Sequence, residues 1–245
     1  MEIVNNKKLT SEQMSQESQY VNPYHYFIER GSFRGNEYFS YVDKCIQIVN
    51  NYSDKKILDI GCGDGFFVGQ LNYKCNKIFA LDYSKRALEF AKIFNKERKI
   101  NFVHGEMENM PFPDNSFDVV TNIAVLEHIK RENVPTCVKE ITRVLKNNGI
   151  LILAIPTDVT TPPKKHFQHF SIEEIKNITG EYFNVKETYG IYNNLYRFLL
   201  KLFDNRFYEI RPISKFLKRT AFYKYFANSP IKFAEMIVFV LEKKF

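Results

Sequence analysis

Short apolar runs alternate with helix-prone segments along most of this chain, and this alternation restricts the fold more than any other feature. We expect strands at the apolar runs, which cover residues 55–61, 77–82, 100–106, 117–123 and 150–156. We expect helices at residues 64–72, 84–95, 133–149 and 171–179, the third ended by a cap at Gly149. Strands joined by helices form βαβ units, so the chain is predicted to be an α/β protein with a Rossmann-like, mostly parallel sheet and helices on both faces. Two further strands, at 181–190 and 234–244, bring the expected number to seven.

A glycine-rich loop, LDIGCGDG at Leu58–Gly65, follows the first expected strand. Glycine is required where the backbone turns sharply and approaches a ligand without an intervening Cβ. In such sheets ligands bind at the carboxyl ends of the strands, so we expect a ligand here; the alternative is a structural turn. The dinucleotide fingerprint is G-x-G-x-x-G, whereas this loop has G-x-G-x-G and Phe66 at the third glycine position. This spacing favours a ligand that presents no phosphate to the loop.

Asp82 ends the second expected strand, 21 residues after Gly61. A carboxylate at this point can accept hydrogen bonds from both hydroxyls of a ribose. Dinucleotide-binding proteins carry an acidic residue at a similar spacing, so Asp82 indicates a ribose without identifying the ligand.

Five motifs follow one another along the chain: LDIGCGDG, ALDYS, GEMENMPFPDNSFDVV, AVLEHI and EITRVLKNNGILILAIP. In these motifs the chain resembles class I S-adenosylmethionine (SAM)-dependent methyltransferases of the ubiquinone-biosynthesis-like type (methyltransferase type 11), over residues 54–190 and the final strand. The resemblance implies SAM as the cofactor, S-adenosyl-L-homocysteine as its product, and a seven-stranded sheet whose last strand is antiparallel. It carries almost no information about the methyl acceptor.

The resemblance also implies roles for residues near the first two strands. Asp59 would hold the methionine part of SAM together with the loop backbone, which comprises Gly61, Cys62 and Gly63. Asp82 would hold the ribose.

Residues after the second, third and fourth strands would surround the adenine and the reacting methyl group. Tyr83 would lie beside the adenine, with core packing as the alternative. Glu106 would accept a hydrogen bond from the adenine amino group, although the family usually has Asp there. The Met107 N–H would meet an adenine nitrogen, again with core packing as the alternative. Asn122 would lie near the methionine amino group or the methyl group.

Three histidines are candidate catalytic bases: His128, His166 and His169. Glu127 is a further candidate, and structural hydrogen bonding is the alternative for each histidine. A general base is needed only if the nucleophile arrives protonated. The i, i+3 spacing of His166 and His169 suits a metal ion, but no third ligand is apparent, so no metal site is expected.

The chain divides into an N-terminal helical segment (1–52), a SAM-binding core (53–191), a cap insertion (192–234) and a final core strand (235–245). Arg30 and Arg34, in the first segment, could pair with the SAM carboxylate or remain solvated.

The segment 192–234 holds nine Lys or Arg and two Asp or Glu, a net charge of +7 that equals that of the whole chain, and twelve aromatic residues. We expect a helical cap. Three interpretations stay open: a lid with a solvated basic face, contact with a membrane surface, or recognition of an anionic acceptor such as RNA.

We expect methyl transfer to oxygen or nitrogen of a small-molecule, sugar or lipid-linked acceptor. The alternatives are a catalytically silent SAM-binding partner subunit, an RNA or protein methyltransferase and, less favoured, an NAD-dependent oxidoreductase. DNA is disfavoured as a substrate because Asn122–Val125 (NIAV) is not the Asn/Asp-Pro-Pro-aromatic motif of amino-methylating enzymes. The sequence makes no prediction of oligomeric state.

A cytoplasmic location, with peripheral membrane contact through 192–234 as an extension, is expected. The chain shows no signal-type apolar stretch and no CxxC pair among its four cysteines.

Overall fold

The computed structural model describes the chain at residues 14, 17–18, 20–30, 32–72, 76–163, 166–193, 198, 202, 210, 212–213 and 228–245. Its centre is an eight-stranded sheet of order β3-β2-β1-β4-β5-β8-β6-β7. The strands are β1 (Lys56–Ile60), β2 (Lys77–Asp82), β3 (Ile100–His104), β4 (Phe117–Ile123), β5 (Leu145–Pro156), β6 (Phe183–Asn193), β7 (Asn228–Ser229) and β8 (Ala234–Lys243).

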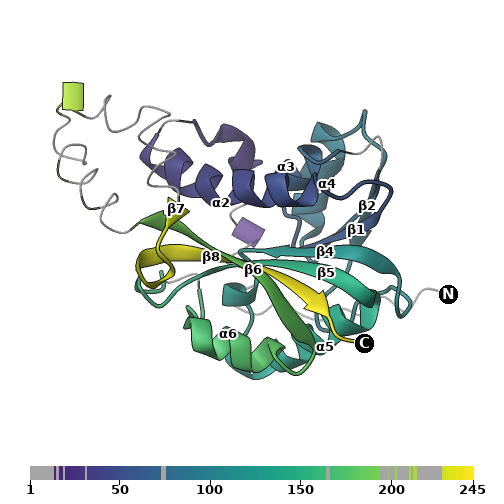
Figure 1. The fold of residues 1–245 in the computed structure, drawn as a ribbon. Coiled ribbons are helices and arrows are strands. Elements are labelled where there is room, and N and C mark those ends of the chain that lie inside the picture. Colours follow the sequence, from purple (N-terminus) through teal and green to yellow (C-terminus); the bar gives the residue numbers. More distant parts are fainter. Residues whose placement is uncertain are drawn as a thin grey trace.

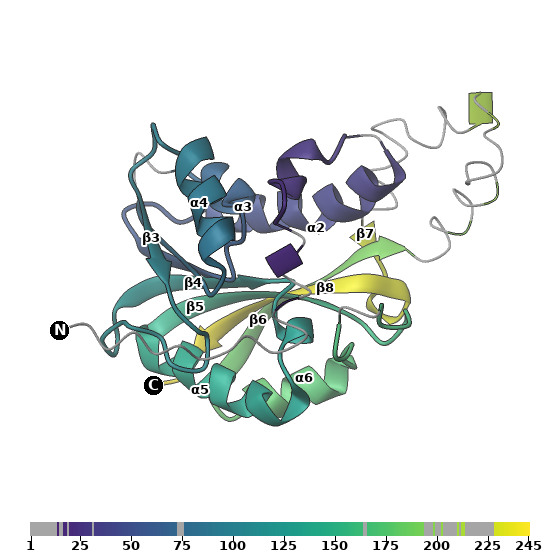
Figure 2. The same ribbon diagram turned by 180° about the vertical axis from the view of Figure 1, so that it is seen from behind.

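Helices cover both faces of this sheet (Figures 1 and 2). The first face carries α2 (Phe33–Val49), α3 (Phe66–Gly69) and α4 (Lys85–Phe94). The second carries α5 (Val134–Val144) and α6 (Ile172–Thr179). Short 3₁₀ helices occur at η1 (Tyr24–Phe27), η2 (Leu126–His128), η3 (Arg131–Asn133) and η4 (Ile231–Phe233).

Serine side chains start three of the helices by accepting a backbone N–H of the first turn. Ser32 caps α2, Ser84 caps α4 and Ser171 caps α6. Each hydroxyl satisfies one of the N–H groups that lack an intrahelical partner.

Strand directions agree with the predicted Rossmann-like fold. β3, β2, β1, β4 and β5 are mutually parallel, and β8 lies antiparallel between β5 and β6. The antiparallel last strand is therefore confirmed. The eighth strand, β7, has only two residues and pairs with the end of β6. From β1 the chain order runs outward in both directions, to β2 and to β4, which creates the switch point where ligands bind in open α/β sheets.

Two predicted helices are shorter than expected. The helix expected at 133–149 ends at Val144, and Gly149 lies inside β5 instead of capping a helix. Leu145 adopts an extended conformation because it is fully buried and pairs with Phe117 of β4. The helix expected at 64–72 is reduced to the single turn of α3.

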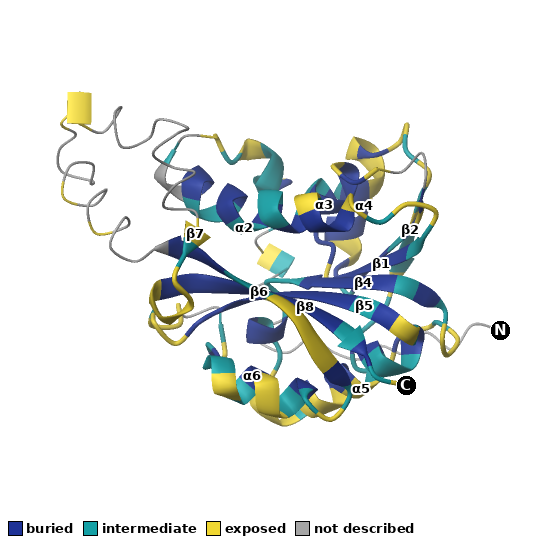
Figure 3. Cartoon of the chain, viewed as in Figure 1, coloured by how far each residue is buried: buried dark blue, intermediate teal, exposed yellow. Residues whose placement is uncertain are grey.

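The sheet separates two hydrophobic clusters. One packs under α5 and α6 and includes Phe117, Ile141 and Phe239; the other packs under α2 and α4 and includes Val42, Leu88 and Val238. The central strands are buried on both faces and the outer helix faces are exposed (Figure 3). Near-continuous apolar runs are therefore what β5 and β8 require.

Candidate functional site

A cavity of about 1520 Å³ opens at the carboxyl ends of the parallel strands. Its walls come from the N-terminal segment, the loops after β1, β2, β3 and β4, the segment after β5, and the start of β8. This is the ligand-binding edge expected for a sheet of this order.

The glycine loop after β1 is held against the end of β2. The N–H groups of Gly61 and Cys62 both donate to the carbonyl of Leu81, at 2.8 and 3.0 Å. Gly61 and Gly63 adopt φ of 76° and 54°, a left-handed conformation that favours glycine. A Cβ at Gly61 would lie 2.4 Å from Val125 Cγ2, so the loop lies as close to the neighbouring segment as a glycine allows.

Asp82 lies beside this loop, and the protein itself uses part of the hydrogen-bonding capacity of its carboxylate. Its two oxygens accept hydrogen bonds from the N–H groups of Gly63, at 2.7 Å, and Ser84, at 2.8 Å. An ionised carboxylate has about four lone-pair sites, so two remain for hydroxyl groups of a ligand. Burial raises the pKa of Asp82 to about 6, an effect that the two N–H donors oppose.

Asp59 provides a second buried carboxylate in the cavity wall. It is 3% exposed and accepts a 2.5 Å hydrogen bond from Thr121 Oγ1. Burial raises its pKa to about 7, and the charge of Asp82 adds to this effect. A buried acid of this kind favours a ligand with a positive group, because the ion pair would offset the cost of ionising the carboxyl.

The remaining predicted cofactor residues divide into two groups. Cys62, Tyr83, Glu106 and Met107 line the cavity. Asn122, at the end of β4, is fully buried and is not among the lining residues; its amide donates to Met107 Sδ at 3.7 Å.

The N-terminal segment covers the glycine loop, which the sequence analysis did not anticipate. The N–H and Nδ1 of His25 both contact the buried carboxylate of Asp64, at 3.1 and 2.9 Å. A Cβ at Gly63 would lie 2.5 Å from Tyr20 Oη, so Tyr20 lies directly over the loop. The tyrosines spaced along residues 20–41 were the available sequence signal.

The two arginines considered for a SAM carboxylate differ in what the structure describes. Arg30 forms a bidentate pair with Asp43, at 2.7 and 2.8 Å, and its guanidinium lies over the Phe39 ring. The Arg34 side chain lies outside the described residues.

The three predicted histidines meet at the other end of the cavity. His128 ends η2, while His166 and His169 lie between β5 and α6. The centroids of the His128 and His166 rings are 4.7 Å apart, and His166 Nδ1 lies 3.0 Å from His169 Nε2. All three line the cavity.

Hydrogen bonding fixes the neutral tautomers of two of these rings. His169 Nδ1 lies 2.7 Å from the Thr160 carbonyl, which can only accept, so this nitrogen carries the proton. His169 Nε2 is then the acceptor in the contact with His166, and His166 Nδ1 is the donor. The neutral His166 ring therefore has its lone pair on Nε2.

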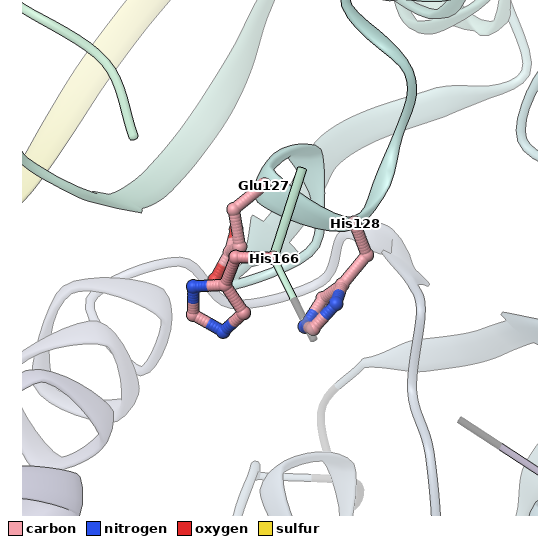
Figure 4. A group of neighbouring side chains, drawn as sticks. All are labelled: Glu127, His128 and His166. Atoms are coloured by element: carbon pink, nitrogen blue, oxygen red, sulfur yellow. The ribbon is translucent and has the colours of Figure 1, made fainter. Parts of the chain in front are cut away.

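Glu127, which precedes His128 in the sequence, places its side chain next to the histidine rings (Figure 4). Glu127 is 2% exposed and lines the cavity, and the Phe167 N–H donates to the backbone carbonyl of Glu127 at 2.9 Å. One ligand atom each of Glu127, His128 and His166 lies within 4.8 Å of the other two. The fold therefore groups His166 with Glu127 and His128, whereas the sequence analysis considered only His166 and His169 as a pair for a metal ion.

Most of the predicted cap at 192–234 lies outside the described residues. Of its described part, Phe198 lines the cavity. Within the described portion of the chain, no helix combines the length and apolar character needed to cross a bilayer.

Comparisons with known proteins agree on the class of enzyme. Residues 58–153 match the family model described as a methyltransferase domain. An uncharacterized protein, MJ0638, of Methanocaldococcus jannaschii is 33% identical over 67% of this chain and 68% of its own length. A probable SAM-dependent methyltransferase of Mycolicibacterium smegmatis is 24% identical over 60% of this chain and 59% of its own length.

A solved structure with the same fold contains the demethylated cofactor. It is the N-methyltransferase NodS from Bradyrhizobium japonicum WM9 in complex with S-adenosyl-L-homocysteine, with a TM-score of 0.65 and 15% identity over 96% of this chain and 98% of that one. With the glycine loop, the buried carboxylates of Asp59 and Asp82 and the strand order, these matches identify the chain as a class I SAM-dependent methyltransferase of the type 11 family.

Proposed function

We propose that this enzyme transfers the methyl group of SAM to an oxygen or nitrogen atom of a small-molecule, sugar or lipid-linked acceptor. The observation that carries the proposal is the division of one cavity into two chemically different ends. The buried carboxylates of Asp59 and Asp82 and the glycine loop lie at the carboxyl ends of β1 and β2, and imidazoles lie after β4 and β5. The first end suits the cofactor and the second suits an acceptor that must lose a proton.

The cofactor end has the groups that SAM needs. Asp59 would pair with the ammonium of the methionine part, while Asp82 would use its remaining lone pairs for the ribose hydroxyls. Glu106 and Met107 would meet the adenine, with Tyr83 beside it. Because Asn122 contacts Met107, we assign it a positioning role.

SAM supplies a methyl group on a sulfonium centre that is already an activated leaving group. The protein therefore has to align the acceptor and exclude water, and Tyr20 and His25 lie over the glycine loop where such a cover is needed. As the acceptor atom bonds to the methyl carbon, the C–S electron pair remains on sulfur and the acceptor proton leaves. We assign a role in the removal of that proton to His128, His166 and His169, which lie close together in the cavity wall.

We assign the choice of acceptor to residues 192–234. Phe198 from this segment lines the cavity, and the segment carries the net charge of the chain. Its lysines and arginines could attract an anionic part of the acceptor or an anionic membrane surface. The absence of an Asn-Pro-Pro-aromatic motif at Asn122–Val125 disfavours DNA.

Transfer from tritium-labelled SAM into fractionated host extract tests the proposal. We expect label in a small-molecule or lipid fraction, and much less label at the same SAM concentration with the Asp82→Ala variant as control. Label in RNA or protein would replace the proposed acceptor class with a polymer. Binding of SAM without transfer to any fraction would identify a silent partner subunit and contradict the proposal.

A further inference from the structure

We infer that Glu127, His128 and His166 form a binding site for a divalent transition-metal ion, and that this ion holds and activates an acceptor hydroxyl. Two chain segments supply the ligands: η2 after β4 gives Glu127 and His128, and the segment after β5 gives His166. Figure 4 shows the three side chains as neighbours, with the Glu127 carboxylate next to the His166 ring. The role of the ion rests on the proposed function, whereas its binding does not.

The separation of the ligand atoms is close to that of a loaded site. Three atoms that lie no more than 4.8 Å from one another share a central point within about 2.8 Å of each, whereas metal–nitrogen and metal–oxygen bonds measure about 2.0–2.2 Å. Each atom therefore needs to move by less than about 1 Å, which side-chain rotation can supply. No rearrangement of η2 or of the backbone at His166 is required.

The partner of His166 has the character of a group that orients a metal ligand. Ligating histidines typically donate their second ring N–H to a fixed acceptor, which sets the tautomer and the ring orientation. His166 Nδ1 donates to His169 at 3.0 Å, and His169 is anchored to the Thr160 carbonyl at 2.7 Å. These two hydrogen bonds leave the lone pair of the neutral His166 ring on Nε2. A ring nitrogen with a lone pair is the one that binds a metal ion.

The charge of the cavity favours a cation at this position. Its described lining residues include ten Asp or Glu side chains and one Lys or Arg, the exposed Lys130. Glu127 and Glu235 are buried, at 2% and 4% exposure. A cleft lined predominantly by one sign of charge concentrates ions of the opposite sign.

Two imidazoles and one carboxylate suit Zn²⁺, Mn²⁺, Fe²⁺ or Co²⁺, and three protein ligands leave coordination positions open. A hydroxyl that occupies an open position has a lowered pKa, so it can release its proton to solvent before its oxygen attacks the methyl carbon. The C–S electron pair then stays on sulfur, and no oxidant or reductant is needed. This places the acceptor among hydroxyl compounds.

Direct ion binding to the full chain, freed of metal by a chelator, tests the inference. We expect calorimetry with Zn²⁺ and visible absorption with Co²⁺ to show one ion per chain. Glu127→Gln and His166→Ala should each weaken binding by more than about 100-fold, since loss of a ligand exceeds the roughly 10- to 100-fold loss expected for an orienting partner. His169→Ala should fall in that smaller range. His104→Ala, which removes a histidine from β3 outside the cluster, should leave ion binding unchanged.

Binding of S-adenosyl-L-homocysteine to each variant serves as the folding control and should be retained. Failure of the wild-type chain to bind either ion, or ion affinity in Glu127→Gln and His166→Ala equal to that of the wild type, would overturn the site. If the histidine variants lose methyl transfer while chelators have no effect, the inference fails and the proposed function stands. Tight ion binding by a chain that methylates nothing would support the site and contradict the proposed function.

Discussion

Replacing Asp59 with asparagine should stabilise the ligand-free protein above neutral pH and weaken its hold on the cofactor. Burial, with a contribution from the charge of Asp82, raises the pKa of Asp59 from 3.8 to about 7. The folded state thus binds this proton more tightly than the unfolded chain does. The stability linked to it is complete below about pH 4 and is lost as the pH rises to 7.

The size of the effect follows from the pKa difference. About three pKa units correspond to roughly 4 kcal/mol of folding free energy lost by pH 8. Asparagine cannot ionise, and its carbonyl can still accept from Thr121 Oγ1, although a charged acceptor is better by about 1 kcal/mol. We therefore expect Asp59→Asn to gain about 3 kcal/mol at pH 8 and nothing near pH 4.

Urea unfolding of both proteins at pH 4.5 and pH 8 measures this difference. Asp118→Asn is a matched control of opposite sign. Burial alone would raise the pKa of Asp118, but the hydrogen bonds from Lys146 and the Lys56 N–H outweigh burial, so the pKa is lowered. The ionised Asp118 carboxylate therefore stabilises the folded state, and Asp118→Asn should lose stability at pH 8. The same stability difference between Asp59→Asn and wild type at both pH values would refute the reasoning.

Cofactor affinity should fall at least about tenfold in Asp59→Asn, because a charge-assisted bond of at least about 1.5 kcal/mol is removed.

Three further predictions concern the loop, the ribose contact and the cap. Asp82→Ala should weaken S-adenosyl-L-homocysteine binding about 10- to 150-fold by calorimetry, as expected from the loss of a charged hydrogen bond of about 1.5–3 kcal/mol, with circular dichroism showing a retained fold. Gly61→Ala should lower the melting temperature and the cofactor affinity together, because its Cβ would lie 2.4 Å from Val125 at a φ of 76°; an unchanged melting temperature would contradict the geometry. Replacing 192–234 by a short loop should preserve cofactor binding and abolish transfer to the native acceptor, whereas normal turnover would show that the segment does not select it.

Local features of the site could be predicted because neighbouring residues determine them. The glycine loop comes directly after β1, and Asp82 is the last residue of β2. Because β1 and β2 pair side by side, the hydrogen bond from Gly63 to Asp82 joins the ends of two neighbouring strands. The long apolar runs predicted the central strands for the same reason. The end of the helix at Val144 was missed because contacts with distant residues decide it: Lys243 donates to the Leu145 carbonyl from the last strand.

Other parts of the site depend on contacts that no local pattern encodes. His25 and Asp64 are 39 residues apart, and their pairing places the tyrosine-rich segment over the loop. Glu127 meets His166 because the segments after β4 and β5 run to the same edge of the sheet. Arg143, in the fifth motif, binds Glu140, Asp114 and two backbone carbonyls of the segment 110–112, contacts that the motif alone does not reveal.

Calorimetric titration of the purified chain with S-adenosyl-L-homocysteine and, separately, with NAD⁺ tests the central claim most directly. The G-x-G-x-G loop, the buried carboxylates of Asp59 and Asp82, and a loop without the third glycine of the dinucleotide motif predict saturable heat from the first ligand only. Heat from NAD⁺ with none from S-adenosyl-L-homocysteine would contradict the account.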